Sequence, residues 1–185
     1  MSHTEIPGLV YISNFITKDE EKELLKTIRE QEWLGDLKRR VQHYGYKYDY
    51  RKRKIDESMA LGPLPPFLEE LATRLMDEDI INEKPDQAII NEYKPGQGIS
   101  RHIDKVSLFK EEIVSLSLGS NYNMVFQKGR DLKEVRLRRR SLVVMKDDAR
   151  YKYTHYIPSR LTDEWNGKKY KRGTRISITF RKVKI

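Results

Sequence analysis

Two side chains that bind metal ions well lie two residues apart in the segment RHIDK, at His102 and Asp104. Residues i and i+2 of a β-strand point to the same face, so this imidazole and this carboxylate can reach one point. His155, in the segment YKYTHYIP, is a third candidate ligand. Two histidines and one carboxylate on one side of an ion form the facial triad of non-haem Fe(II) oxygenases, which leaves coordination positions open. The alternative is that these side chains are only hydrogen-bonded within the fold.

Two arginines near the end of the chain are suited to an anionic ligand. Arg175 and Arg181 are six residues apart in TRISITFR, an even spacing that puts them on one strand face with Ser177 and Thr179. A guanidinium binds a carboxylate through two parallel, charge-assisted hydrogen bonds, so this face can hold the two carboxylates of a small dicarboxylic acid. The alternative is an ordinary strand surface with solvated polar side chains.

An amide and a phenol have the same spacing in INEYKPGQG, at Asn91 and Tyr93. Both groups can hydrogen-bond to the same acid. The glycine-rich turn that follows brings the chain to His102 within nine residues of Tyr93. By itself the segment is a strand and a turn.

The elements that must position these residues follow from the hydrophobic pattern. FITKDEEKELLKTIREQEW predicts a helix with a capping box of Thr17 and Glu20, and LPPFLEELATRLMDE predicts a second helix with proline in its first turn. After Pro85, alternation predicts strands at QAIINEY, EIVSLSLGS, VRLRRRSLVVM and TRISITFRKVKI. Two helices followed by short strands indicate an α+β chain dominated by a barrel or sandwich.

The composition limits the classes of function. The 185 residues fit one domain, and a net charge of +9 favours an anionic partner, nucleic acid before a membrane surface. The alternative is that these charges are only solvated. The absence of cysteine excludes disulfides, zinc-thiolate sites and thiol catalysis. No signal-peptide pattern or long apolar run occurs, so we expect a soluble intracellular protein, in cytoplasm or nucleus, with no membrane contact.

Tyrosines occupy every second position of HYGYKYDY, from Tyr44 to Tyr50. The surrounding segment 38–54 contains eight lysines and arginines. Aromatic faces stack nucleobases and basic side chains bind phosphates, so this segment could contact nucleic acid. The alternative is a plain strand face whose tyrosines cover a sheet.

The motifs N-x-Y-x-P-G, H-x-D, SLSLGS, a later histidine and R-x5-R occur in this order between about residues 87 and 183. This ordered set resembles the AlkB family of Fe(II)/2-oxoglutarate-dependent dioxygenases. Within the family it is most similar to the AlkB domain of the eukaryotic homologue that modifies tRNA, in which stretches such as KPDQ, PGQG and FRKV recur. That homologue also carries an RNA-recognition domain and a methyltransferase, which we do not expect in a chain of 185 residues.

The resemblance implies a double-stranded β-helix, or jelly roll, with N-terminal helices packed on one sheet. It implies one oxygenase domain over residues 1–185, with a nucleotide-recognition lid at about residues 38–58. The implied cofactor is Fe(II), and the cosubstrates are 2-oxoglutarate and O2. The nucleic-acid partner would be RNA or DNA, single-stranded or with its target base flipped out of the duplex.

The resemblance also assigns roles to single residues. His102, Asp104 and His155 would hold Fe(II). Arg175 with Tyr93 would bind the distal carboxylate of 2-oxoglutarate, while Arg181 with Asn91 would lie by the end that chelates iron. Ser177 occupies a position where the bacterial founding member has asparagine, so its role is left open. The lid candidates for contact with substrate are Arg39, Arg40, Tyr44, Tyr46 and Tyr48, with the run 51–54 as further phosphate contacts.

One departure from the family bears on the substrate. Members that repair DNA carry an acidic residue one or two places after the metal-binding aspartate, where this chain has Lys105 and Val106. We therefore expect oxidation of a modified base in nucleic acid, by demethylation or hydroxylation, with a slight preference for RNA such as tRNA. The alternatives are a DNA-repair demethylase of N-alkylated bases, a non-catalytic nucleic-acid binder that keeps the fold, and an oxygenase with a protein substrate. We expect a monomer, because the sequence carries no dimerisation signal.

Overall fold

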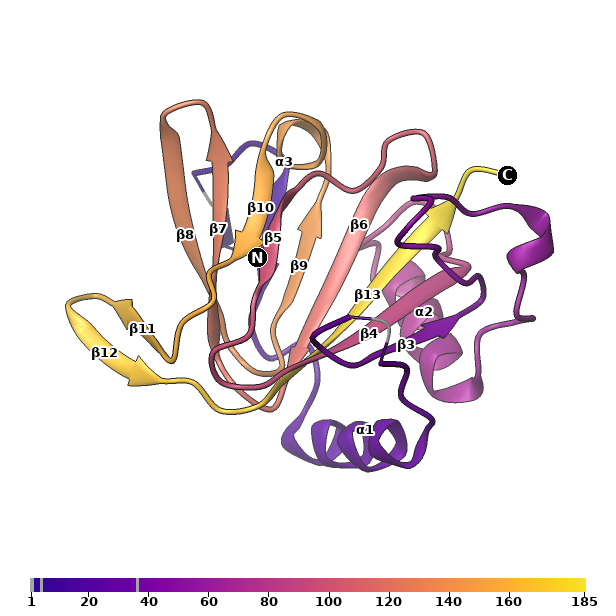
Figure 1. Ribbon diagram of the computed structural model, residues 1–185, viewed down its shortest axis with the longest axis horizontal. Helices are drawn as coiled ribbons and strands as arrows, with labels where there is room; N and C mark the ends of the chain where they lie inside the picture. The colour runs from indigo at the N-terminus through magenta and orange to yellow at the C-terminus, as the bar shows by residue number, and fades with distance from the viewer. Residues whose placement is uncertain (1, 4, 36) are drawn as a thin grey trace.

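Two antiparallel sheets form the body of the protein in a computed structural model, which describes residues 2–3, 5–35 and 37–185. Figure 1 shows the larger sheet crossing behind the smaller one. In spatial order the larger sheet contains β1 (Ser2–His3), β2 (Leu9–Ile12), β9 (Leu142–Met145), β6 (Phe109–Leu118), β13 (Arg175–Val183), β4 (Gln87–Tyr93) and β3 (Val41–Tyr44). The smaller sheet contains β5 (Ile99–His102), β10 (Thr154–Ile157), β7 (Tyr122–Lys128) and β8 (Asp131–Leu137).

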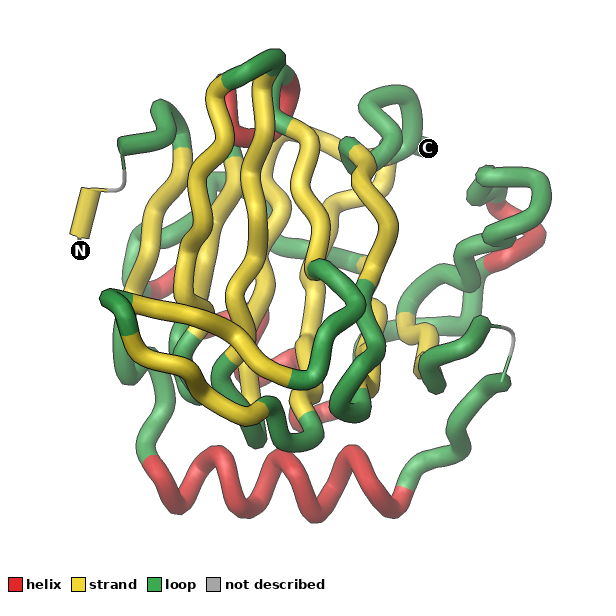
Figure 2. Tube along the Cα trace, turned by 60° about the vertical axis from the view of Figure 1, so that its left-hand side comes forward, coloured by secondary structure: helices red, strands yellow, loops and turns green. Residues whose placement is uncertain are grey.

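Helices cover the outer face of the larger sheet. The capping box of Thr17 and Glu20 begins α1 (Lys18–Glu30) as predicted, and prolines begin α2 (Pro66–Asp77). Figure 2 shows α1 along the lower ends of the strands. Leu25 and Ile28 of α1 and Leu68 of α2 pack with Ile178 of β13 in one buried cluster. Burying each such side chain stabilises the fold by about 1.5–3 kcal/mol, so the helices hold this sheet rigid.

A second hydrophobic cluster lies between the two sheets. It joins Ile113 and Val183 of the larger sheet to Tyr122 and Phe126 of the smaller one. The predicted double-stranded β-helix with helices on one sheet is therefore confirmed. A separate hairpin of β11 (Thr162–Trp165) and β12 (Lys168–Lys171) precedes β13. No helix among the described residues is long and apolar enough to cross a membrane.

The strand β13 has two different faces, as its sequence predicts. Ile176, Ile178 and Phe180 pack under the helices. Arg175 and Arg181 alternate with them and so face the smaller sheet. The same alternation applies to β4, whose Tyr93 and Asn91 lie opposite Arg175 and Ser177. The larger sheet therefore presents a row of polar side chains to the space between the sheets.

The segment VRLRRRSLVVM is two strands rather than one. It contains the end of β8 and all of β9, which belong to different sheets, and the chain turns between them at Arg140 with a positive φ of 66°. Arg139 and Arg140 bind the buried carboxylate of Glu21 in α1, with nitrogen–oxygen distances of 2.9 and 3.2 Å. These two ion pairs therefore hold the turn between β8 and β9 against α1.

The tyrosine alternation does not form one strand, which excludes the alternative of a plain strand face. Strand β3 ends at Tyr44, because Gly45 has a positive φ of 75° and a Cβ there would lie 1.8 Å from the carbonyl oxygen of Asp86. The chain beyond Gly45 forms a loop closed by bridges between Tyr46 and Ala60 and between Asp49 and Lys54. We call residues 45–60 the lid loop. It includes a short 3-10 helix, η1 (Glu57–Met59).

Candidate active site

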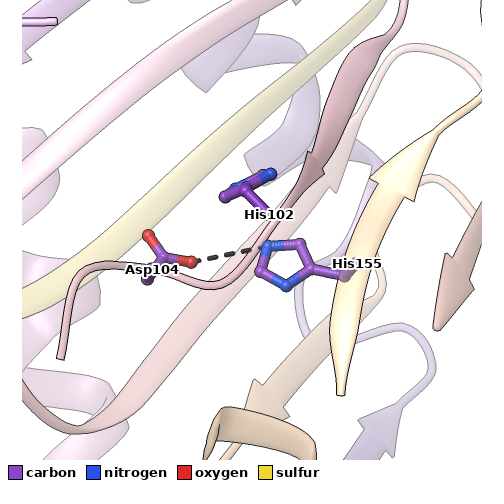
Figure 3. Close-up of side chains that lie close together, drawn as sticks. All are labelled: His102, Asp104 and His155. Atoms are coloured by element: carbon purple, nitrogen blue, oxygen red, sulfur yellow. Dashed lines mark ion pairs between the residues drawn. The ribbon is translucent and has the colours of Figure 1, made fainter. Parts of the chain in front are cut away.

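Two histidines face each other across adjacent strands of the smaller sheet. His102 is the last residue of β5, and His155 lies opposite it on β10, in antiparallel register. Their ring centroids are 4.3 Å apart, and Figure 3 shows both side chains on the same side of the sheet as Asp104. The pairing of β5 with β10 thus brings together two imidazoles that are 53 positions apart in the sequence.

Asp104 completes the group from a loop, not from the strand that the His-x-Asp spacing predicted. β5 ends at His102, and Asp104 lies two residues beyond it. Even so, one ligand atom from each of the three residues lies within 4.8 Å of the others. His155 Nε2 lies 3.4 Å from Asp104 Oδ2. The three side chains could therefore hold one metal ion.

A main-chain contact orients the imidazole of His102. Its Nδ1 lies 2.7 Å from the carbonyl oxygen of Ser100, which can only accept a hydrogen bond. Nδ1 of the neutral ring therefore carries the proton, and Nε2 keeps its lone pair. A metal-binding histidine commonly has this arrangement, with the second nitrogen fixed by a carbonyl.

Burial and nearby charges set the protonation states of the other two residues. Burial lowers the pKa of His155 to about 3, assisted by His102. Burial alone would raise the pKa of Asp104, but Arg181 and the two histidines outweigh it and lower that pKa to about 2. At neutral pH His155 is therefore an uncharged imidazole and Asp104 a carboxylate, the forms that bind a metal ion.

Arg181 holds one oxygen of Asp104. Its Nη2 lies 2.6 Å from Asp104 Oδ1, and its guanidinium lies over the ring of Phe109 at 4.6 Å. The other carboxylate oxygen, Oδ2, faces His155. Arg181 thus leaves one oxygen of Asp104 for a metal. This pairing was not predicted from the sequence, which assigned Arg181 to a cosubstrate.

Arg175 lies deeper between the sheets and is 1% exposed. It donates a hydrogen bond from Nη2 to Ser117 Oγ at 2.9 Å and lies 5.3 Å from the centroid of the Tyr93 ring. Within the described part of the chain, the buried Nε atoms of Arg175 and Arg181 have no hydrogen-bond partner. Buried guanidinium groups need an acceptor, so both fit a site for an anion.

Further polar groups continue this row across three strands. Ser177 lies between Asn91 of β4 and Ser117 of β6 in the sheet register. All three are buried, and Asn91 accepts a hydrogen bond at Oδ1 from Arg39 Nε at 2.9 Å. The sequence grouped Asn91, Ser177 and Arg175 correctly on one face, but it did not reveal Ser117 or the contact with Arg39.

A cavity of about 480 Å³ opens at the candidate metal site and is lined by two of the candidate ligands, His102 and Asp104. Its walls come from the larger sheet and the segment before β3, from β5 and the loop after it, and from the lid loop. Tyr48 and Tyr50 of the lid lie edge to face with ring centroids 4.9 Å apart, and Tyr48 also contacts Phe109. The charged residues of the lining are Arg39, Arg53, Arg101, Asp104, Lys105 and Arg181. Cations therefore dominate a cavity that has aromatic walls.

The structure separates the predicted substrate residues into two groups. Arg39 and Tyr48 line the cavity. Arg40 instead pairs with Glu92 at 2.8 Å and stacks on Trp33, while Tyr44 packs against Phe67 of α2 and donates to Gln42. Tyr46 packs beside the core between the sheets and is absent from the described lining.

Some lining residues were not selected from the sequence. Tyr50 shares the alternation of its neighbours, so the pattern contained a signal for it. Arg53 belongs to the basic run 51–54 that the sequence marked, whereas Phe109 carries no such signal, because only the fold brings it to the cavity. Lys105 also joins these two segments, since its Nζ donates to the carbonyl oxygen of Arg53 at 2.7 Å.

Several known proteins have sequences similar to this chain. The family described as the 2OG-Fe(II) oxygenase superfamily matches residues 8–181. An uncharacterized protein of Acanthamoeba polyphaga mimivirus, L905, is 44% identical over 95% of this chain and 85% of its own length. The mouse tRNA (carboxymethyluridine(34)-5-O)-methyltransferase ALKBH8 is 39% identical over 96% of this chain, which spans only 31% of the mouse protein. The Arabidopsis thaliana alkylated DNA repair protein ALKBH8 homolog is 36% identical over 99% of this chain and 60% of its own length.

The fold is also similar to a solved structure. OsALKBH1 superposes with a TM-score of 0.69 over 97% of this chain and 99% of that chain, at 18% sequence identity. The chain belongs to the 2OG-Fe(II) oxygenase superfamily and is a dioxygenase, and its sequence is similar to AlkB homologues. The predicted resemblance to the AlkB domain of the tRNA-modifying homologue is confirmed. The family implies Fe(II), 2-oxoglutarate and O2, and the donor set of two imidazoles and one carboxylate fits Fe(II).

The low pKa of His155 predicts an acid-sensitive fold. The value is about 3 in the folded protein against 6.5 for an unperturbed histidine, so between these values only the unfolded chain takes up a proton at this residue. The stability contributed by neutral His155 is present above pH 6.5 and falls as the pH drops, with a slope of up to about 1.4 kcal/mol per pH unit. Urea unfolding of the metal-free protein between pH 7 and 4.5 should therefore be less pH-dependent for His155→Gln. Equal slopes for both proteins would contradict the assignment.

Proposed function

We propose that this protein binds Fe(II) through His102, Asp104 and His155 and oxidises modified bases in nucleic acid, with RNA preferred over DNA. One observation carries this proposal. Two of the three candidate ligands, His102 and Asp104, line a cavity whose other walls hold two tyrosines in edge-to-face contact and several cations. An oxidation site, aromatic faces for a base and positive charge for a phosphate backbone are thus combined in one place.

We further propose that 2-oxoglutarate binds between the ligands and the polar row of the larger sheet. Arg175 would bind the distal carboxylate with Tyr93, because it is a buried cation whose Nε lacks a partner among the described residues. Asn91 and Ser177 would hydrogen-bond the same molecule from neighbouring positions of the row. Arg181 would then stabilise negative charge at the metal end, in addition to its contact with Asp104.

The iron supplies the oxidising chemistry when it is bound together with O2 and the oxoacid. The side chains of this chain position and shield the reactants. Arg175 orients the cosubstrate, and the aromatic rings of Tyr48, Tyr50 and Phe109 exclude water from one side of the cavity. Oxygen enters a C–H bond of the substrate. An N-methyl group then leaves as formaldehyde, whereas a group bound through carbon stays as an alcohol.

The substrate base must leave its stack to reach this cavity. Tyr50 is suited to receive it, because it lines the cavity beside Tyr48 and keeps its hydroxyl proton at neutral pH, its pKa being raised by burial. Arg53 of the lid and Arg39 supply positive charge in the same lining. We therefore propose that residues 45–60, most of which fall in the region 38–58 predicted as a lid, cover the flipped nucleotide in a single oxygenase domain.

Lys105 supports a preference among bases. Lys105 lines the cavity next to Asp104, its ammonium contacts the lid at Arg53, and an ammonium only donates hydrogen bonds. It is compatible with the O4 acceptor of uracil, whereas the exocyclic amine of adenine or cytosine presents donors. The mouse relative is named for a tRNA uridine activity, which agrees with a modified uridine in RNA. The Arabidopsis relative is named as a DNA-repair protein, so repair of N-alkylated DNA is the second candidate.

Turnover on matched oligonucleotides tests this function. The protein is incubated with Fe(II), 2-oxoglutarate and whole tRNA, or with RNA and DNA of one sequence that carry single modified bases. Succinate release and mass spectrometry of the bases should show coupled oxidation, fastest on RNA and absent in Asp104→Ala. No turnover on any nucleic acid by metal-loaded protein would contradict the proposal. Fastest turnover on methyladenine in DNA would contradict the inference from Lys105.

The tyrosines of the segment provide a matched pair of variants. Tyr50→Leu removes a cavity ring, and loss of base stacking of about 1–3 kcal/mol predicts a KM for the oligonucleotide that is roughly 5- to 150-fold higher. Tyr44→Leu removes a ring that packs against α2 instead and should lower thermal stability without changing this KM. Equal KM values for the two variants would show that Tyr50 does not contact the substrate.

A further inference from the structure

A buried arginine contacts the main chain of the candidate metal site and forms no ion pair with any carboxylate in the described part of the chain. Arg150 of α3 (Asp147–Tyr151) is 2% exposed. Its guanidinium donates to three main-chain carbonyl oxygens: Asp104 from Nη1 at 2.7 Å, Phe109 from Nη2 at 3.3 Å and Lys110 from Nε at 3.4 Å. Burying a charged group that is not paired with an opposite charge is unfavourable, so a role in positioning offers a reason for it.

The three carbonyls mark the two ends of one loop. The loop begins at Asp104, just after β5, and ends at Phe109, the first residue of β6. Within the loop, Lys105 and Val106 line a surface depression next to the cavity. Near the far end of the loop, the carbonyl oxygen of Leu108 accepts a hydrogen bond from the main-chain N–H of Lys184. Arg150 therefore forms hydrogen bonds at both ends of the loop, and one of them fixes the carbonyl oxygen of Asp104.

We propose that Arg150 is a positioning residue for the metal-binding carboxylate of Asp104. Since Asp104 is not part of a strand, the β-sheet hydrogen bonds that place His102 and His155 do not fix its main chain. Arg150 supplies that constraint, and Arg181 then orients the side chain by binding Oδ1. This inference rests on the proposed role of Asp104 as a ligand. It adds the residue that sets the position from which this ligand reaches the metal.

Binding of Co(II), an air-stable probe of the Fe(II) site, tests the role without measuring turnover. Isothermal titration of the metal-free protein should show about 10- to 100-fold weaker Co(II) binding for Arg150→Met, the range typical of residues that orient metal ligands. Arg150→Lys keeps the charge and one donor, so its loss should be smaller. The Co(II) visible spectrum should change in both, because the carboxylate no longer reaches the metal in the same geometry.

A second buried arginine serves as the matched control. Arg136 of β8 is 8% exposed, donates to Asn123 Oδ1 at 3.0 Å and stacks on Tyr170, on a strand that carries no candidate ligand. Arg136→Met should lower the melting temperature and leave Co(II) affinity within about twofold. Affinities are compared below the melting temperature of each variant, and Arg150→Lys carries the test if Arg150→Met does not fold.

A double-mutant cycle separates positioning from a general loss of order. In an Asp104→Ala background there is no carboxylate to position, so Arg150→Lys should weaken Co(II) binding no further. An equal loss in both backgrounds, or unchanged affinity in Arg150→Lys and Arg150→Met, would overturn the role of Arg150 alone. Failure of the unmodified protein to bind Co(II) would instead overturn the proposed metal site.

Discussion

The buried carboxylate of Asp104 is the group on which the site depends. Only 6% of this residue is exposed, and burial by itself favours the neutral acid, which is a poor metal ligand. Arg181 reverses that preference by direct contact, and its charge is brought there by β13 of the larger sheet. The ligand group is therefore complete only when both sheets are packed together, so folding and the capacity to bind a metal are coupled.

The two sheets contribute different chemical groups to the site. The smaller sheet supplies both histidines through one strand pairing, and small shifts of register there would separate the rings. The larger sheet is braced by helices on one face and offers arginines and small polar side chains on the other. A rigid sheet suits the task of holding a charged molecule in a fixed orientation, because little reorganisation is needed when that molecule binds. The lid loop is held instead by its own bridges and by the contact between Lys105 and Arg53.

The faces of β-strands were predicted reliably from patterns that repeat along the sequence. The assignment of Arg175 and Ile176 to opposite faces of β13 needed only the two-residue period and the contrast between apolar and charged positions. The same reasoning failed for the tyrosines, since Gly45 turns the chain where it meets Asp86, and that contact comes from a distant segment. The burial of Arg150 could not be predicted, because the sequence does not distinguish it from the other members of a set of 37 lysines and arginines. Contacts between segments, rather than local pattern, decide these positions.

The most direct measurement is the visible absorption of the anaerobic protein with Fe(II) and 2-oxoglutarate. An oxoacid that chelates Fe(II) produces a weak charge-transfer band, which reports metal and cosubstrate in one site before any substrate is added. We predict this band for the unmodified protein, its absence in Asp104→Ala, and a higher half-saturating concentration of 2-oxoglutarate in Arg175→Gln. A band of equal intensity in Asp104→Ala, or none in the unmodified protein, would contradict the central claim that these residues form the iron and 2-oxoglutarate site.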